Sequence, residues 1–105
     1  IRALAVTSAG REPSFPDLPT VADTVPGYEA TAWFGIGMPK ATPREAIEKM
    51  NAAVNRALAD PKLRARLAEL GGQPIAGTPE DFGRTIVAET EKWAKVVASS
   101  GATVD

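Results

Sequence analysis

The sequence predicts an α/β fold in which short strands are followed by three helices packed on a sheet. Three observations predict it. Residues 3–6 form a short, uninterrupted apolar run, residues 28–38 are rich in aromatic side chains, and the remainder repeats apolar residues at helical spacing. A short apolar run is typical of a strand covered on both faces, as in parallel sheets. We therefore expect strands that are buried from both sides.

The first strand is expected at the start of the chain, and an ordered loop follows it. The chain begins in the apolar run without a Met or a signal peptide, so we expect a piece of a longer protein. Residues 11–27 hold four prolines, which exclude a regular strand or a long helix. Within this loop, Thr20 and Asp23 match an N-cap threonine with an acid three residues later, which predicts one short helical turn.

Residues 28–38 are predicted to form the second strand. Gly35 and Gly37 lie two apart and face the same way, so another backbone or a ligand can approach closely. A tight packing contact or a bulge accounts for the same two glycines. Trp33 and Phe34 face opposite ways because strand residues alternate. Burying both requires material on each side of the strand, either a sheet covered on both faces or a cleft.

Two of the three predicted helices begin with the same motif. Thr42-Pro43-Arg44-Glu45 and Thr78-Pro79-Glu80-Asp81 each combine an N-cap threonine, a proline at the first helical position and an acid at the third. The third helix is expected to run for about 22 residues before Gly101 ends it.

The middle helix is predicted between two recognisable breaks. Asp60-Pro61 ends the first helix and caps the second, and Gly71-Gly72 ends the second. The brief extended piece at 73–76 is expected to add an edge strand.

Each helix carries an apolar stripe that is predicted to be buried. The stripes are Ile47, Met50, Val54, Ala57 and Leu58 in the first helix, Leu63, Leu67 and Leu70 in the second, and Phe82, Ile86, Trp93 and Val97 in the third. The charged residues Glu89, Glu91, Lys92 and Lys95 are typical of a solvated face. Glu89 and Glu91 point in different directions on a helix, so they cannot share a proton or a substrate.

The composition of the 105 residues is that of one ordinary soluble domain and excludes several classes of function. Lys and Arg total 12 against 13 Asp and Glu, which disfavours a nucleic-acid or anionic-membrane surface. Cys and His are both absent, which excludes thiol nucleophiles, imidazole bases and zinc fingers. We expect no catalytic residue, no metal site, no cofactor and no nucleic-acid partner.

A series of short motifs runs along essentially the whole chain. They are Arg2-Ala3-Leu4-Ala5-Val6-Thr7-Ser8, Pro16-Asp17-Leu18-Pro19-Thr20-Val21-Ala22-Asp23, Pro26-Gly27-Tyr28-Glu29, Trp33-Phe34-Gly35, Pro39-Lys40-Ala41-Thr42-Pro43, Asp60-Pro61, Leu70-Gly71-Gly72, Gly77-Thr78-Pro79-Glu80-Asp81-Phe82 and Glu91-Lys92-Trp93. In this order and spacing the motifs closely resemble the receptors of tripartite tricarboxylate transporters, also called Bug proteins. That family more usually has Glu at the position of Asp23, which keeps the carboxylate of the cap.

The resemblance implies a periplasmic solute receptor with no catalytic activity. Such receptors have two α/β lobes joined by crossing strands, in a type II periplasmic-binding-protein fold. They close on a small carboxylate, such as a di- or tricarboxylate or an amino acid, and pass it to membrane transporter subunits. Residues 1–27 would then end the second lobe, 28–38 would be the crossing or hinge strand, and 39–105 the C-terminal helical part of the first lobe.

Six residues are candidates for the ligand cleft by their position. Thr7 and Ser8 follow a strand at its C-terminal end, where α/β sheets present ligand sites. Thr20 begins a helical turn whose free backbone amides suit a carboxylate. Trp33, Phe34 and Gly35 lie in the crossing strand.

A different class of function is also compatible with this sequence. In a stand-alone helical protein-interaction module, the apolar stripes and Trp33-Phe34 would dock a protein partner. If the chain is part of a receptor, strands at 2–6 and 31–38 would have unpaired edges, and we expect self-association, with strand exchange between copies.

Overall fold

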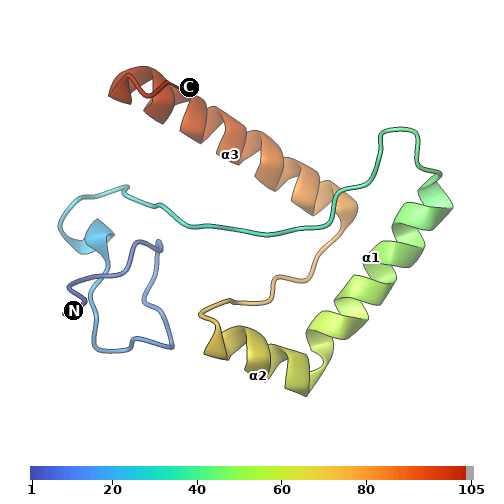
Figure 1. Cartoon of the computed structure of the whole chain (residues 1–105), viewed down its shortest axis with the longest axis horizontal. Helices are drawn as coiled ribbons and strands as arrows, with labels where there is room; N and C mark the ends of the chain where they lie inside the picture. Colours follow the sequence, from blue (N-terminus) through green and yellow to red (C-terminus); the bar gives the residue numbers. More distant parts are fainter. Residues whose placement is uncertain (104–105) are drawn as a thin grey trace.

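The structure, a computed structural model, describes residues 1–103. It contains a 3-10 turn, η1 (Val21–Asp23), and three α-helices, α1 (Arg44–Ala59), α2 (Pro61–Glu69) and α3 (Pro79–Ser100) (Figure 1). The number and order of the predicted helices are therefore confirmed. Residues 104 and 105, at the end of the predicted helical part 39–105, lie outside the described residues.

Most helix boundaries follow the caps that the sequence predicts. The hydroxyls of Thr20 and Thr78 each accept a hydrogen bond from the backbone amide three residues later, and the carboxylate of that residue accepts one from the threonine amide. Asp60 accepts from the amides of Lys62 and Leu63 at the start of α2. α3 also has the predicted length of 22 residues. It ends at Gly101, which adopts φ 68°, a left-handed conformation that favours glycine.

The predicted cap of the first helix is wrong. α1 begins at Arg44 with Pro43 as its N-cap, and no side chain caps it. The amide of Thr42 instead donates to the carbonyl of Pro39 at 2.9 Å, in a turn that precedes the helix. Thr42 is therefore one residue too early to bond the first free amides.

Within residues 1–103, the predicted strands form no ladder. Segments 28–38 and 73–76 lie outside helices without strand pairing, and the first segment contributes one parallel bridge, between Val6 and Thr20. In that bridge Val6 donates to the carbonyl of Pro19 and accepts from the amide of Val21, both at 2.9 Å. A strand needs a neighbouring strand to satisfy its backbone groups, and the described chain does not supply one to these segments.

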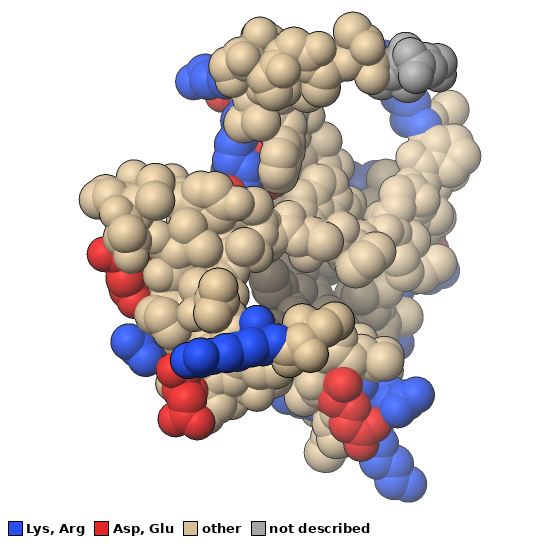
Figure 2. All heavy atoms as spheres, turned by 60° about the vertical axis from the view of Figure 1, so that its left-hand side comes forward, with Lys and Arg blue, Asp and Glu red and all other residues tan. Residues whose placement is uncertain are grey.

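The chain encloses no hydrophobic core among its described residues, and Thr20 is the one buried side chain. The accessible surface is 8629 Å², whereas a compact protein of the same mass exposes about 5,600 Å². The radius of gyration is 16.8 Å, compared with about 13 Å for a compact chain of this length. Figure 2 shows the same openness as hollows across a largely uncharged face.

The expected burial of the helical stripes is only partly met. Ile47, Val54, Leu58, Leu67 and Phe82 are half-buried, where α1 contacts both α2 and α3 or where α3 meets the extended segment. Along the rest of α3 the prediction is wrong, because Ile86, Trp93 and Val97 remain 40% to 50% exposed. No element within residues 1–103 covers this part of the stripe, so its apolar area remains open.

In the described part of the chain, no helix combines the length and apolarity that crossing a membrane requires.

Candidate functional site

Three of the six candidate residues lie in one small unit at the N-terminal end. Thr7 and Ser8 directly follow the bridge residue Val6, and Thr20 pairs with it. The carbonyl of Thr7 accepts from the amide of Ala30 at 2.9 Å. Thr7 is exposed, whereas Ser8 is half-buried and donates its hydroxyl to the carbonyl of Gly10 at 2.8 Å.

Three backbone amides of the turn at Thr20 already have partners within the described residues. The amide of Thr20 donates to Asp23 Oδ2 at 3.1 Å, and the amide of Asp23 donates to Thr20 Oγ1 at 3.2 Å. The amide of Val21 is bound to the carbonyl of Val6. Thr20 itself is only 5% exposed. The capping box and the bridge to Val6 therefore occupy the amides of Thr20, Val21 and Asp23, and these bonds hold the loop in place.

The other three candidates lie in the extended segment, and two of them contact α3. The ring of Trp33 meets the ring of Phe82 edge-on, with centroids 5.5 Å apart and planes at 83°. Gly35 lies so close to the same ring that an added Cβ would overlap it. Gly37, by contrast, has open space around it. The close approach expected at the glycine pair thus occurs at Gly35, and it is a packing contact.

Phe34 points away from this contact, as strand alternation predicts. Its side chain is 96% exposed, compared with 40% for Trp33. Within residues 1–103, no hydrogen bond or aromatic contact joins the Trp33–Gly35 group to the Thr7, Ser8 and Thr20 group. The structure therefore assembles five of the six candidates into two groups, and Phe34 lies apart from both.

A carboxylate that the sequence reasoning assigned to a solvated face is held by two neighbours on α3. Glu89 accepts from the indole nitrogen of Trp93 at 2.8 Å and pairs with Lys92 Nζ at 2.5 Å. Its side chain is only 17% exposed and that of Lys92 30%, so the solvated-face prediction is wrong for these two residues. The contact with Lys92 and the hydrogen bond from the Trp93 indole lower the pKa of Glu89, although burial opposes them.

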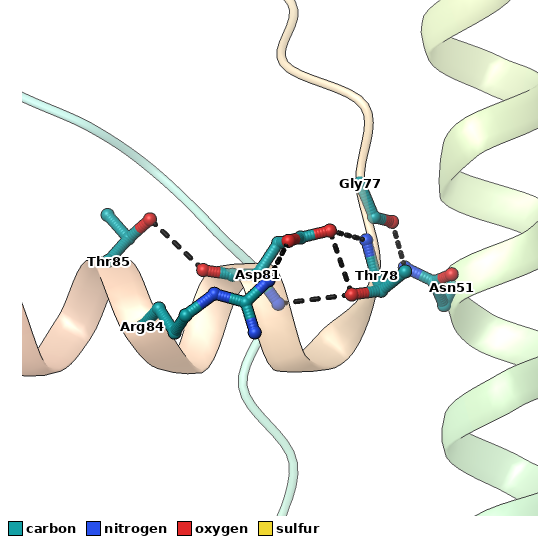
Figure 3. Close-up of polar contacts among 6 residues, drawn as sticks. All are labelled: Asn51, Gly77, Thr78, Asp81, Arg84 and Thr85. Carbon is teal, nitrogen blue, oxygen red and sulfur yellow. Dashed lines mark hydrogen bonds and ion pairs between the residues drawn. The ribbon is translucent and has the colours of Figure 1, made fainter.

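A second polar cluster joins α1 to the start of α3, as Figure 3 shows. The side-chain amides of Asn51 and Asn55 both donate to the carbonyl of Gly77 at 2.9 Å. Asn55 also accepts from the amide of Gly77 at 3.2 Å. The adjacent Thr78 donates its amide and its hydroxyl to Asp81 Oδ2, each at 2.8 Å.

These residues hold the chain together rather than forming a reactive centre. The sequence reasoning missed Asn51 and Asn55, although their spacing of four residues beside an apolar stripe was a usable signal. Within residues 1–103, no group of three or more acidic side chains lies close enough to bind a metal ion. The hollows on this part of the surface, one along α3 and one between Ser14 and Arg64, are not lined by any of the six candidates.

Within residues 1–103, the candidate residues thus belong to loops and helices whose apolar faces are largely uncovered. Residues 1–102 match the model of the tripartite tricarboxylate transporter family receptor. The chain belongs to this family, as the sequence resemblance predicts.

Relatives and a solved structure agree with this assignment. The chain is 40% identical over 99 residues to the UPF0065 protein in the tcbD-tcbE intergenic region of Pseudomonas sp. (strain P51), covering 92% of this chain and 30% of that protein. It is 35% identical over 103 residues to protein BugT of Bordetella pertussis, covering 97% of this chain and 32% of BugT. The chain thus spans about a third of the length of these two relatives.

The solved structure of the periplasmic binding protein BugD is similar to this chain with a TM-score of 0.80 and 33% identity. The match covers 92% of this chain and 33% of BugD. It confirms the predicted fold class, part of an α/β periplasmic-binding-protein fold. It also accounts for the openness of the structure, because about two thirds of BugD has no counterpart here.

Proposed function

We propose that this chain is the C-terminal part of an extracytoplasmic solute receptor that binds a small carboxylate for uptake by a tripartite tricarboxylate transporter. The observation that carries the proposal is the family match over residues 1–102 together with the likeness to BugD. In this proposal the receptor is periplasmic, performs no catalysis and delivers its ligand to membrane transporter subunits. The ligand is a di- or tricarboxylate or an amino acid.

The division of the chain into lobes is part of the same proposal. Residues 1–27 end the second lobe, 28–38 cross between lobes, and 39–105 form the helical end of the first. The arrangement in Figure 1 supports it, because residues 28–38 run as an extended connection between the N-terminal loops and the helices. The uncovered stripe on α3 supports it as well, since the remainder of the first lobe would cover that stripe.

Among the six candidates, Thr7, Ser8 and Phe34 are best placed to border the ligand. Thr7 and Phe34 are exposed, and no side-chain hydrogen bond within the described residues occupies Thr7. We assign Thr20, Trp33 and Gly35 to positioning, because Thr20 is buried in its cap and the other two pack on α3.

Ligand binding by the intact protein tests the proposal. Citrate, succinate, aspartate and glutamate, each compared with its uncharged methyl ester or amide, are added in a thermal-shift assay and then in calorimetry. A ligand present at 100 times its Kd stabilises the folded state by about 2.7 kcal/mol, so a true ligand raises the melting temperature clearly. If no carboxylate on a broad panel shifts the melting temperature, the proposal is wrong.

The assignment of Thr7 has its own test. A hydrogen bond to a charged group contributes about 1.5–3 kcal/mol, so Thr7→Ala is expected to weaken carboxylate binding roughly tenfold or more. Thr24→Ala is the matched control, because Thr24 is an exposed threonine in the same unit. If the two variants bind the carboxylate with equal affinity, Thr7 does not contact the ligand.

A further inference from the structure

α3 has a second face, opposite to the one that contacts the extended segment. Phe82 makes that contact, and Glu91 lies nine residues later, about two and a half turns, so it points to the other side. In Figure 1, α3 lies at the edge of the chain. An open hollow follows this second face, and it is lined by Glu80, Gly83, Arg84, Val87, Ala88 and Glu91. These six residues, continued by Lys95 one turn further, are the outer face of α3.

The outer face is expected to remain at the surface of the intact protein. All of its residues are exposed, and four of them are charged: Glu80, Arg84, Glu91 and Lys95. Charged side chains are rarely buried inside a protein, so the remainder of the chain has little reason to cover them. The apolar residues that need a cover, such as Ile86 and Trp93, lie on a different side of the helix. The outer face is therefore free to meet another molecule.

The order of charges on the outer face is complementary to itself in one orientation. Along the helix it reads acid, base, two apolar residues, acid and base. If a second α3 lies antiparallel with Val87 opposite Ala88, positions equally far from this centre face each other. Arg84 then faces Glu91 of the second copy, and Glu80 faces its Lys95. A two-fold axis makes each of these pairs occur twice, whereas a parallel arrangement places like charges opposite each other.

The side chains on this face can form those contacts. Val87 is 58% exposed, and an added Cβ at Gly83 would meet nothing within 4 Å, so a second helix can approach closely. Within residues 1–103, Glu91 and Lys95 form no ion pair. Arg84 pairs with Asp81 through one terminal nitrogen. The other donors of its guanidinium can therefore bind a second carboxylate.

We propose that two copies of the intact protein associate through the outer faces of their α3 helices, as an antiparallel pair with two-fold symmetry. This inference goes beyond the proposed function and does not rest on it. From Glu80 to Lys95 the contact spans about 22 Å of helix, so the interface is small and the dimer is weak. Because exposed charges supply much of the attraction, salt weakens the dimer.

Sedimentation of the intact protein without ligand tests the inference. From micromolar to millimolar concentration, the dimer fraction is expected to rise at low salt and to fall when salt is added. Arg84→Glu and Glu91→Arg are each expected to weaken dimerisation about tenfold, because two pairs of like charges replace two attractive pairs. The double variant with both changes has complementary charges again and should recover most of the dimer.

Two sets of variants keep the test specific. Arg64→Glu is the matched control, because Arg64 is an exposed arginine of α2 outside the outer face, and it should leave dimerisation unchanged. Circular dichroism checks that each variant is folded. If Arg84→Glu does not fold, Glu80→Lys and Lys95→Glu, alone and together, test the second predicted pair with the same expected pattern.

The inference is overturned if the intact protein is a monomer at every concentration. It is also overturned if a dimer forms but the double variant is as weak as the single variants, or if Arg64→Glu weakens it equally. Such results would assign the contact to another surface or the outer face to another partner. Because these measurements need no ligand, a monomer that binds a carboxylate would refute the dimer and support the proposed function.

Discussion

Gly35 and Gly37 look equivalent in the sequence, but their surroundings differ. A Cβ at Gly35 would overlap the ring of Phe82, whereas one at Gly37 would meet nothing within 4 Å. Overpacking of this kind destabilises by about 1–3 kcal/mol. We expect Gly35→Ala to lower the free energy of unfolding by that amount and Gly37→Ala to change it little. Urea unfolding of both variants measures the difference, and equal effects would contradict the close approach.

Asn55 binds both backbone groups of Gly77, whereas Asn51 binds only its carbonyl. Replacing Asn55 by Ala therefore leaves a part-buried amide without its partner, and an unsatisfied group of this kind destabilises by about 1–3 kcal/mol. We expect Asn55→Ala to destabilise the protein more than Asn51→Ala. Thermal unfolding of the two variants checks the order, and the reverse order would show that the attachment of Gly77 to α1 depends more on Asn51.

At the scale of helices, the two Thr-Pro starts provide a matched comparison. Thr78 caps α3 through its side chain, whereas Thr42 caps nothing. Loss of an N-cap threonine typically costs about 1 kcal/mol. Thr78→Ala should therefore destabilise by that amount and Thr42→Ala by much less. Circular dichroism during urea unfolding gives both values, and equal losses would mean that Thr42 also forms a cap.

The start of α3 is also expected to respond to acid. Bonds from the Thr78 amide and hydroxyl lower the pKa of Asp81, and the ion pair with Arg84 adds to them. A carboxyl whose pKa is depressed on folding stabilises the folded state above its unfolded pKa of about 4. That stabilisation is lost as the pH falls from there through the lower folded pKa. Asp81→Asn should flatten the stability profile below about pH 4, and an unchanged profile would exclude this contribution.

The extent to which the sequence predicted these elements depends on how local each interaction is. Thr20, Asp60 and Thr78 bond to residues two or three positions away, so their caps could be recognised from adjacent letters. Thr42 has the same letters around it, and the turn from Pro39 shifted the helix start by one residue.

Contacts between residues far apart in the chain could not be predicted from the sequence pattern. Phe82 meets Trp33 and Gly35, which lie more than 40 positions earlier in the chain, so adjacent letters could not reveal this contact. The strand pattern of residues 28–38 was recognised as extended, but strand pairing requires a partner that the described residues do not provide. The distance along the chain also explains why five of the six candidate residues form two groups, with Phe34 apart from both.

For the whole molecule, the uncovered apolar surface predicts how the 105-residue chain behaves alone. Its surface exceeds that of a compact protein by about 3,000 Å², more than the roughly 1,600 Å² buried in a standard stable interface. We expect the isolated chain to self-associate, and analytical ultracentrifugation over a concentration series measures this. A well-folded monomer at all concentrations would contradict it and would favour the alternative of a stand-alone interaction module.

The junction at Asp60 has a consequence for how the family can vary in length. Asp60 ends α1 and also caps α2 through its side chain, so no spacer separates the two helices. Each helical residue turns the chain by about 100°, so one inserted residue would rotate α2 relative to α1, which it contacts. The 73–76 connection holds no such double cap and can absorb an added residue. Related receptors that carry an insertion should therefore have it after α2, whereas the junction between α1 and α2 should have the same length in all of them.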